Sequence, residues 1–416
     1  MTIDTAGQTR EGGAWYQPFS YALCGHLDDV MLSGSSACAS GNASKLYTGA
    51  SRYVRHIAFV EGGYVISIDD ITGTGAGTHK FDWRLHKAGT WTTGQLGEYI
   101  VADSLNMRLD IRFLEPAASA IQGSFLPAEL TAQPCVQARV TAASTRITAV
   151  LVPQHNSQPV LTSAMLSATG ATAVEVQGNG SDDVFAVNSG TTGFTAGTIQ
   201  SDATLALVRK QGNKVTFAEM TRGASLVVSG KTLLRSIALC NLSWRGDSSI
   251  VTVEAEPAYK ATGGADTVTV GGLMSSRNYS VSISGTYAGS ATANASGEVR
   301  IPVNLQNRVV IRLAEGVEVE KSGAGIANGR KFLGRQTQSG MEFIVSGIQT
   351  QSLRLRIFNT AGRMIWRWDG TVSGIGPQKI LWPGAGMDGR KASAGVYVAR
   401  VSDGNGVPAL PFVVVR

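Results

Sequence analysis

Charged residues are scarce in this 416-residue chain, in which Asp, Glu, Lys and Arg together make up 16%. A long solvent-exposed helix needs such residues along its outer face, and no stretch combines that density with an apolar period of 3.6 residues. Glycine is instead abundant, with 50 residues, which is typical of turn-rich β-structure. The scarcity of charge therefore predicts an all-β protein.

Long apolar runs and runs of Lys and Arg are also missing. No segment approaches the roughly 18 apolar residues of a membrane-spanning helix, and the opening MTIDTAGQTREGG resembles no signal peptide. The net charge of +6 either helps to attract an acidic polymer or belongs to an ordinary solvated surface. Without a basic patch or a recognised motif, nucleic-acid binding is not expected.

The cysteines are few and widely spaced: Cys24, Cys38, Cys135 and Cys240. They form no C-x-x-C pair, so neither a zinc ribbon nor a redox motif is indicated. Cys24 and Cys38 either close a loop in an exported protein or are buried free thiols. A hydrolase is weakly supported, because no G-x-S-x-G motif occurs and no pair of carboxylates stands out.

Short alternating strands separated by glycine-rich turns fill most of the chain. In residues 55–71, two alternating apolar stretches flank Gly62-Gly63, which predicts a hairpin. Strands recur at the spacing of an antiparallel sandwich. We expect an all-β chain with three parts: a large antiparallel β-sandwich over 1–256, a small β module with its linker over 257–335, and an Ig-like small sandwich over 336–416.

Four of the five histidines lie within the first 86 residues: His26, His56, His79 and His86. If the strands that carry Asp69 and His86 pair, these two side chains converge, and His56 arrives from the preceding strand. Neutral imidazoles and a carboxylate can hold Zn²⁺. The alternative is that all of them are hydrogen-bonded surface or core side chains.

Residues 55–86, RHIAFVEGGYVISIDDITGTGAGTHKFDWRLH, resemble the β domain of heparinase II/III-like polysaccharide lyases. In that family an Arg-led strand, a turn, an apolar strand ending in Asp and a strand ending in Leu-His follow in this order. Residues 3–8, 147–154 and 202–229 are similar to further strands, so the resemblance covers about residues 1–255. It implies a structural metal, as in some members of the family, which we expect to be zinc, with Asp69 and His86 as ligands and His56 as the third.

The family's catalytic Tyr, His and Asn belong to a toroid of paired helices, which would lie upstream of Met1 together with a signal peptide. We therefore expect the β portion of an extracellular lyase that acts on uronate-containing polysaccharide by β-elimination and is inactive alone. The alternative is a non-catalytic secreted carbohydrate-binding or cell-surface module. Trp15, Tyr16 and Arg84 are candidates for sugar contacts, although each also suits a core or surface role.

The C-terminal stretch, which begins RLRIFNTAGRMIWRWDG at Arg354 and ends FVVVR, resembles Ig-like sorting domains of the bacterial type IX secretion system and the flagellar hook-cap Ig-like fold. This resemblance implies export to the cell surface or medium of a bacterium, with the secretion machinery as a partner. A β-sandwich without a sorting role is the alternative.

Overall fold

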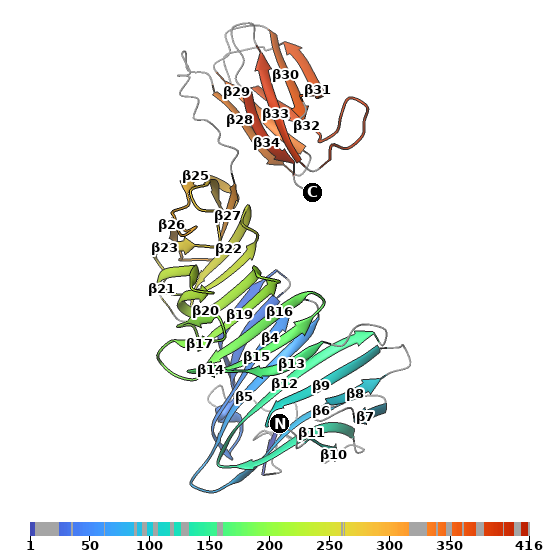
Figure 1. The fold of residues 1–416 in the computed structure, drawn as a ribbon, viewed down its shortest axis with the longest axis vertical. Helices are drawn as coiled ribbons and strands as arrows, with labels where there is room; N and C mark the ends of the chain where they lie inside the picture. Colours follow the sequence, from blue (N-terminus) through green and yellow to red (C-terminus); the bar gives the residue numbers. More distant parts are fainter. Residues whose placement is uncertain are drawn as a thin grey trace, which may run out of the picture. The chain divides into compact units, whose positions relative to one another are not determined.

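The structure is a computed structural model, shown in Figure 1. It describes residues 1–4, 25–34, 36–61, 63–86, 90–93, 98–102, 107–116, 120–125, 133–155, 161–258, 261, 263–315, 331–337, 340–346, 352–359, 362–371, 378–393, 395–402 and 409–414. Contacts divide the chain into two compact units, Met1–Glu315 and Gly316–Arg416.

The predicted all-β class is confirmed. The described residues form antiparallel sheets, and their helical structure is limited to one 3₁₀ turn, η2 (Ser44–Leu46). They contain no helix with the length and apolar character that crossing a membrane requires.

Two sheets make up the N-terminal part of the first unit (Figure 1). The four-stranded sheet has the order β1 (Thr2–Ile3), β6 (His79–His86), β11 (Gln133–Ala142), β10 (Ala120–Phe125). The eight-stranded sheet has the order β2 (His26–Ser33), β3 (Ser36–Asn42), β4 (Ala50–Val60), β5 (Tyr64–Gly73), β12 (Ser144–His155), β9 (Met107–Glu115), β8 (Glu98–Ala102), β7 (Thr90–Thr93). The predicted hairpin is β4–β5, whose turn is closed by the bond from the Gly63 N–H to the Val60 carbonyl at 3.0 Å.

A third, 15-stranded sheet follows in the same unit. Its strands are β13 (Thr162–Leu166), β14 (Ala168–Thr169), β15 (Ala171–Gly178), β16 (Ser181–Asn188), β17 (Phe194–Ala196), β18 (Ile199–Ser201), β19 (Leu205–Gln211), β20 (Lys214–Val228), β21 (Lys231–Gly246), β22 (Ile250–Pro257), β23 (Ala265–Val270), β24 (Asn278–Ile283), β25 (Thr286–Thr292), β26 (Val299–Asn304) and β27 (Val309–Glu315). One buried cluster, which includes Trp244, Tyr279 and Leu313, fills its inner side.

The eight-stranded sheet is a middle layer with a core on each face. Even-numbered residues of β5, such as Ile66 and Ile68, pack with Phe185 and Leu207 of the 15-stranded sheet. Ile71, on the opposite face, joins the core that contains residues of the four-stranded sheet. Burial on both faces explains why most residues of β5 are buried, including the polar Ser67 and Asp69.

The second unit contains two sheets around one core. Three strands, β28 (Lys331–Thr337), β29 (Gly340–Ser346) and β32 (Gln378–Trp382), form one sheet; four, β31 (Met364–Thr371), β30 (Ser352–Asn359), β33 (Gly395–Ser402) and β34 (Ala409–Val414), form the other. Trp382 is fully buried in this core, where its indole N–H donates to the Ala385 carbonyl at 2.7 Å.

The expected boundary at residue 256 falls inside continuous pairing. Strand β22 pairs with β27, and β21 pairs with β23, so strands before and after that position share one sheet and one core. The contacts divide the chain into two units, and the boundary along the sequence follows Glu315. The three-part division with boundaries at 256 and 335 stays a prediction.

Candidate functional site

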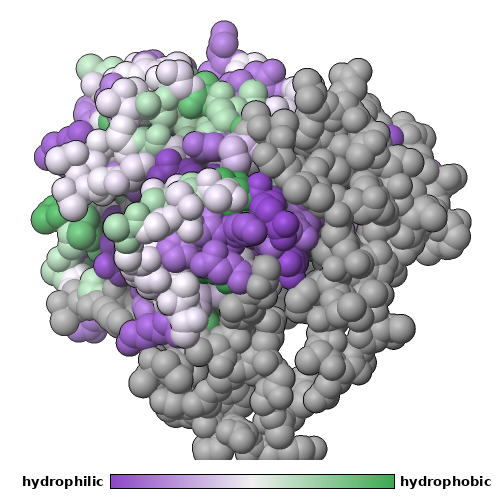
Figure 2. Space-filling view, turned by 90° about the horizontal axis from the view of Figure 1, so that it is seen from below, coloured by the Kyte–Doolittle hydropathy of each residue, from purple (hydrophilic) through white to green (hydrophobic). Residues whose placement is uncertain are grey.

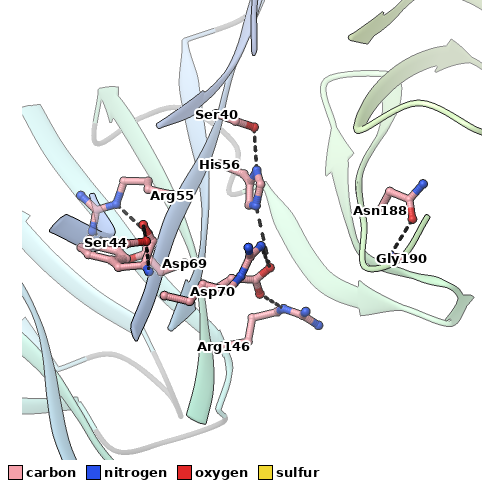
Figure 3. Close-up of polar contacts among 11 residues, drawn as sticks. Ser40, Ser44, Arg55, His56, Asp69, Asp70, Arg146, Asn188 and Gly190 are labelled. Carbon is pink, nitrogen blue, oxygen red and sulfur yellow. Dashed lines mark hydrogen bonds and ion pairs between the residues drawn. The ribbon is translucent and has the colours of Figure 1, made fainter. Parts of the chain in front are cut away.

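Two of the three expected metal ligands lie on opposite faces of the middle sheet. In the β4–β5 hairpin, Arg55 pairs with Asp69 and His56 pairs with Ile68. Asp69 is fully buried and accepts two bonds from the Arg55 guanidinium, at 2.6 and 2.7 Å. His56 points to the other face, as Figure 3 shows.

His56 is part of a chain of polar contacts from Ser40 to Asp70 and Arg146 (Figure 3). Its Nδ1 lies 2.7 Å from the Ser40 hydroxyl, and its Nε2 lies 3.8 Å from Asp70 Oδ2. Arg146 donates to Asp70 at 2.6 Å. Burial acts to raise the pKa of Asp70, but His56 and Arg146 lower it by more, well below its usual range.

This Ser–His–Asp order resembles the residue types of a hydrolytic triad, but its accessibility does not fit one. Ser40 and His56 are 2% and 4% exposed, so a substrate carbonyl cannot reach the hydroxyl. A nucleophile needs that access as well as a base. We therefore assign these contacts a structural role across β3, β4, β5 and β12 of the middle sheet.

The arrangement does not fit a zinc ion held jointly by His56 and Asp69, because one carboxylate is taken up by Arg55 and the two side chains diverge. Strands β5 and β6, which had to pair for Asp69 and His86 to converge as neighbours, belong to different sheets. No group of three possible metal ligands occurs among the described side chains. The side chain of His86 is not among the described ones. Zinc at His56, Asp69 and His86 stays a prediction.

The expected sugar contacts divide between the described residues and the rest. Trp15 and Tyr16 lie outside the described residues. Arg84 is placed on β6, where its side chain is 11% exposed and contacts the buried Asp82 at 2.9 Å. Arg139 binds the same carboxylate at 2.6 Å. Arg84 thus belongs to a buried ion cluster, which favours the structural role over sugar contact.

A polar cavity lies where the middle sheet meets the 15-stranded sheet. Its volume is about 350 Å³, and turns contribute much of its wall. Glu61 comes from the β4–β5 turn and Asn179 from the β15–β16 turn. Tyr64 begins β5, and Arg209 and Arg245 lie near the ends of β19 and β21. Loops carried by a rigid scaffold are common positions for binding residues.

One wall of this cavity is a buried charge cluster of Tyr64, Asp183 and Arg209. The Arg209 guanidinium donates twice to the Asp183 carboxylate, at 2.7 and 2.9 Å, and the Tyr64 hydroxyl donates to the same group. Asp183 is 1% exposed. Burial and the neighbouring Asp183 raise the pKa of Tyr64, and the hydrogen bond to Asp183 raises the pKa of Arg209.

Arg245 stands at the rim of the cavity and is more accessible. Its guanidinium lies 5.1 Å from the centre of the Phe217 ring and 3.1 Å from Glu61 Oε2. The side chains of Arg245 and Glu61 are 41% and 42% exposed. A guanidinium that packs on an aromatic ring at an open rim is well placed to bind a carboxylate.

Figure 2 shows another face of the molecule. Hydrophilic side chains gather in the middle of this face, and apolar ones form small scattered groups around them. Such a mixture is typical of solvated surface.

Sequence reasoning missed the cavity. Its charged residues come from positions 61, 183, 209 and 245, which no short motif links. The available signal was a charge within or at the end of an apolar strand, as in SDDVFAVN and LALVRKQ. That signal marks a buried charge needing a partner but does not identify it.

No family model and no curated protein matches this chain. Distant matches occur among solved structures. Heparan sulfate lyase HepC from Pedobacter heparinus has 12% identity and a TM-score of 0.31, over 40% of this chain and 28% of that one. Heparinase III has 16% identity and a TM-score of 0.32, over 39% and 27%. The matched part is thus less than a third of each lyase chain.

PorZ of Porphyromonas gingivalis, described as an essential surface component of the type-IX secretion system, matches 94% of this chain and 86% of its own. Its identity is 9% and its TM-score 0.17. These TM-scores are too low for the function of this chain to be inferred from the lyases or from PorZ.

Proposed function

We propose that this chain is the β portion of an extracellular polysaccharide lyase and that it binds an acidic, uronate-containing polysaccharide without cleaving it. The observation that supports binding is the cavity beside Arg209 and Arg245. The motif order of residues 55–86 supports the family. A non-catalytic carbohydrate-binding surface module remains the alternative, and it uses the same cavity.

The chemistry of the cavity suits an acidic sugar. Guanidinium groups bind carboxylates with two parallel hydrogen bonds, and Asn179, Ser181 and Gln211 supply donors and acceptors for sugar hydroxyls. The volume of about 350 Å³ is at the lower end of the range for small-molecule sites. It suits one or two sugar units of a longer chain.

Elimination needs a base that removes the proton beside the uronate carboxylate. Tyr64 is the phenol in the cavity lining, but it is 3% exposed and its hydroxyl donates a hydrogen bond to Asp183. Because its pKa is raised, the phenol keeps its proton near neutral pH and is not available to accept another. The cavity therefore favours binding over catalysis.

The test is titration calorimetry with a glucuronate-containing tetrasaccharide and its carboxyl-reduced, neutral analogue. We expect the acidic sugar alone to bind, and Arg245→Ala to weaken binding about tenfold or more, as for a lost hydrogen bond to a charged group. Arg277→Ala is the matched control, because Arg277 does not line the cavity. Its side chain is 63% exposed and forms an ion pair with Glu315, with 3.6 Å between Nε and Oε1. Equal binding of both sugars, or an unchanged Arg245→Ala variant, would contradict the proposal. A rise in ultraviolet absorbance from a new conjugated double bond would show elimination.

We also propose that residues 336–416 form an Ig-like sorting domain read by the secretion machinery. The sequence resemblance supports this, as does the sandwich of three and four strands in the second unit, whose first strand, β28, begins slightly earlier, at Lys331. Deletion of these residues is expected to abolish surface delivery of the exported chain in a type IX-competent bacterium, while a matched chain that keeps them reaches the surface. Delivery that survives the deletion would contradict the role.

A further inference from the structure

We infer that Glu61 is a built-in competitor at the proposed saccharide site, where its carboxylate occupies the position on Arg245 that a uronate carboxylate would take. This inference rests on the proposed function, and it concerns how binding at that same cavity is controlled.

The position of Glu61 supplies the first argument. Its Oε2 lies 3.1 Å from Arg245 Nη1 and 3.8 Å from Arg209 Nη1, so one carboxylate faces both guanidinium groups of the cavity. All three residues line it. A ligand carboxylate that binds these arginines must therefore meet the charge of Glu61 at close range.

Exposure separates Glu61 from the other carboxylate of the cluster. Asp183 is 1% exposed and holds both Arg209 and Tyr64, so removing it would leave buried groups unpaired. The Glu61 and Arg245 side chains are each about two-fifths exposed. Exposed pairs of this kind are weak and exchange readily with solvent or ligand.

The backbone of Glu61 is fixed independently of its side chain. Its N–H donates to the Ser36 hydroxyl at 3.1 Å, and its carbonyl accepts from Arg209 Nη2. The turn can thus stay in place while the side chain rotates away from Arg245. Ligand binding would exchange one arginine–carboxylate pair for another, which limits the affinity for a single uronate.

The test compares the full chain with Glu61→Gln, which keeps the size of the side chain and removes its charge. Glu61→Ala is a second variant, and Glu315→Gln is the matched control, since Glu315 also pairs with an exposed arginine. The probe is the glucuronate-containing tetrasaccharide, titrated by calorimetry at low salt. We expect about fivefold tighter binding for both Glu61 variants, the scale of a strong exposed ion pair, and no change for Glu315→Gln.

Failure of the inference is distinguishable from failure of the proposed function. If the unaltered chain binds the tetrasaccharide and the Glu61 variants bind equally or more weakly, the competitor role is overturned and the binding function stands. An equal gain in Glu315→Gln would also overturn it, because net charge would then be the cause. If no form of the chain binds, both proposals are overturned.

Discussion

Asp183→Ala is expected to lower the free energy of unfolding of the first unit by about 3–5 kcal/mol, the cost of breaking a buried ion pair from one side. The Asp183 carboxylate accepts both guanidinium bonds of Arg209 and the Tyr64 hydroxyl at a site with 1% exposure. Without it, a buried cation and a buried phenol lose their shared partner. The measurement is urea unfolding followed by tryptophan fluorescence.

Two variants separate charge from hydrogen bonding in this cluster. Tyr64→Phe removes one hydroxyl and keeps the ion pair, so we expect a loss of about 1 kcal/mol. Asp183→Asn keeps the shape and removes the charge, so its loss of unfolding free energy should lie between those of Tyr64→Phe and Asp183→Ala. A loss below about 1 kcal/mol for Asp183→Ala would show that Arg209 finds another partner, and the cluster would then not determine the wall of the cavity.

The sequence predicts local features of this fold well. The β4–β5 hairpin follows from alternation on both sides of Gly62-Gly63, because only neighbouring residues take part. The layering of three sheets does not follow, because β6 pairs with β1 and β11 rather than with β5. Such pairings depend on distant segments that periodicity alone cannot connect.

The candidate ligands illustrate how strongly register decides a site. Val60 pairs with Tyr64, so every partner pair of the regular hairpin joins two even or two odd positions. His56 and Asp69 differ in parity and must face opposite sides, because successive side chains of a strand alternate. The sequence contained this information once the turn was placed. The Tyr64–Asp183–Arg209 cluster could not be found this way, since it joins two sheets.

A second large effect is expected at Glu219, a fully buried carboxyl on β20. It is hydrogen-bonded to Ser33 of β2, and its Oε1 has no hydrogen-bond partner among the described residues. Its pKa is raised from 4.5 to about 7, with burial as the largest cause; the hydrogen bonds of Ser33 and Cys38 lower the pKa by less, and Glu254 of β22 adds to the rise. The neutral form is therefore the one that suits the contact between the two sheets.

The direction in which stability changes with pH follows from the protonation of Glu219 in the folded and the unfolded chain. Between pH 4.5 and about 7 the folded chain holds a proton on Glu219 that the unfolded chain has lost, so stability falls as the pH rises through this window. The contribution is present in full below pH 4.5 and is lost above about 7. A shift of this size corresponds to about 3 kcal/mol.

Glu219→Gln should remove this part of the pH dependence, because its uncharged amide resembles the protonated carboxyl in shape. We expect unfolding free energies similar to those of the unaltered chain near pH 4.5 and up to about 3 kcal/mol higher at pH 8. Urea unfolding across this range measures the difference, with Glu315→Gln as a control at a more accessible carboxyl, which is 26% exposed. If Glu219→Gln keeps the original slope, the buried carboxyl is not the source of the pH dependence, and its charged form must be accommodated between β2 and β20.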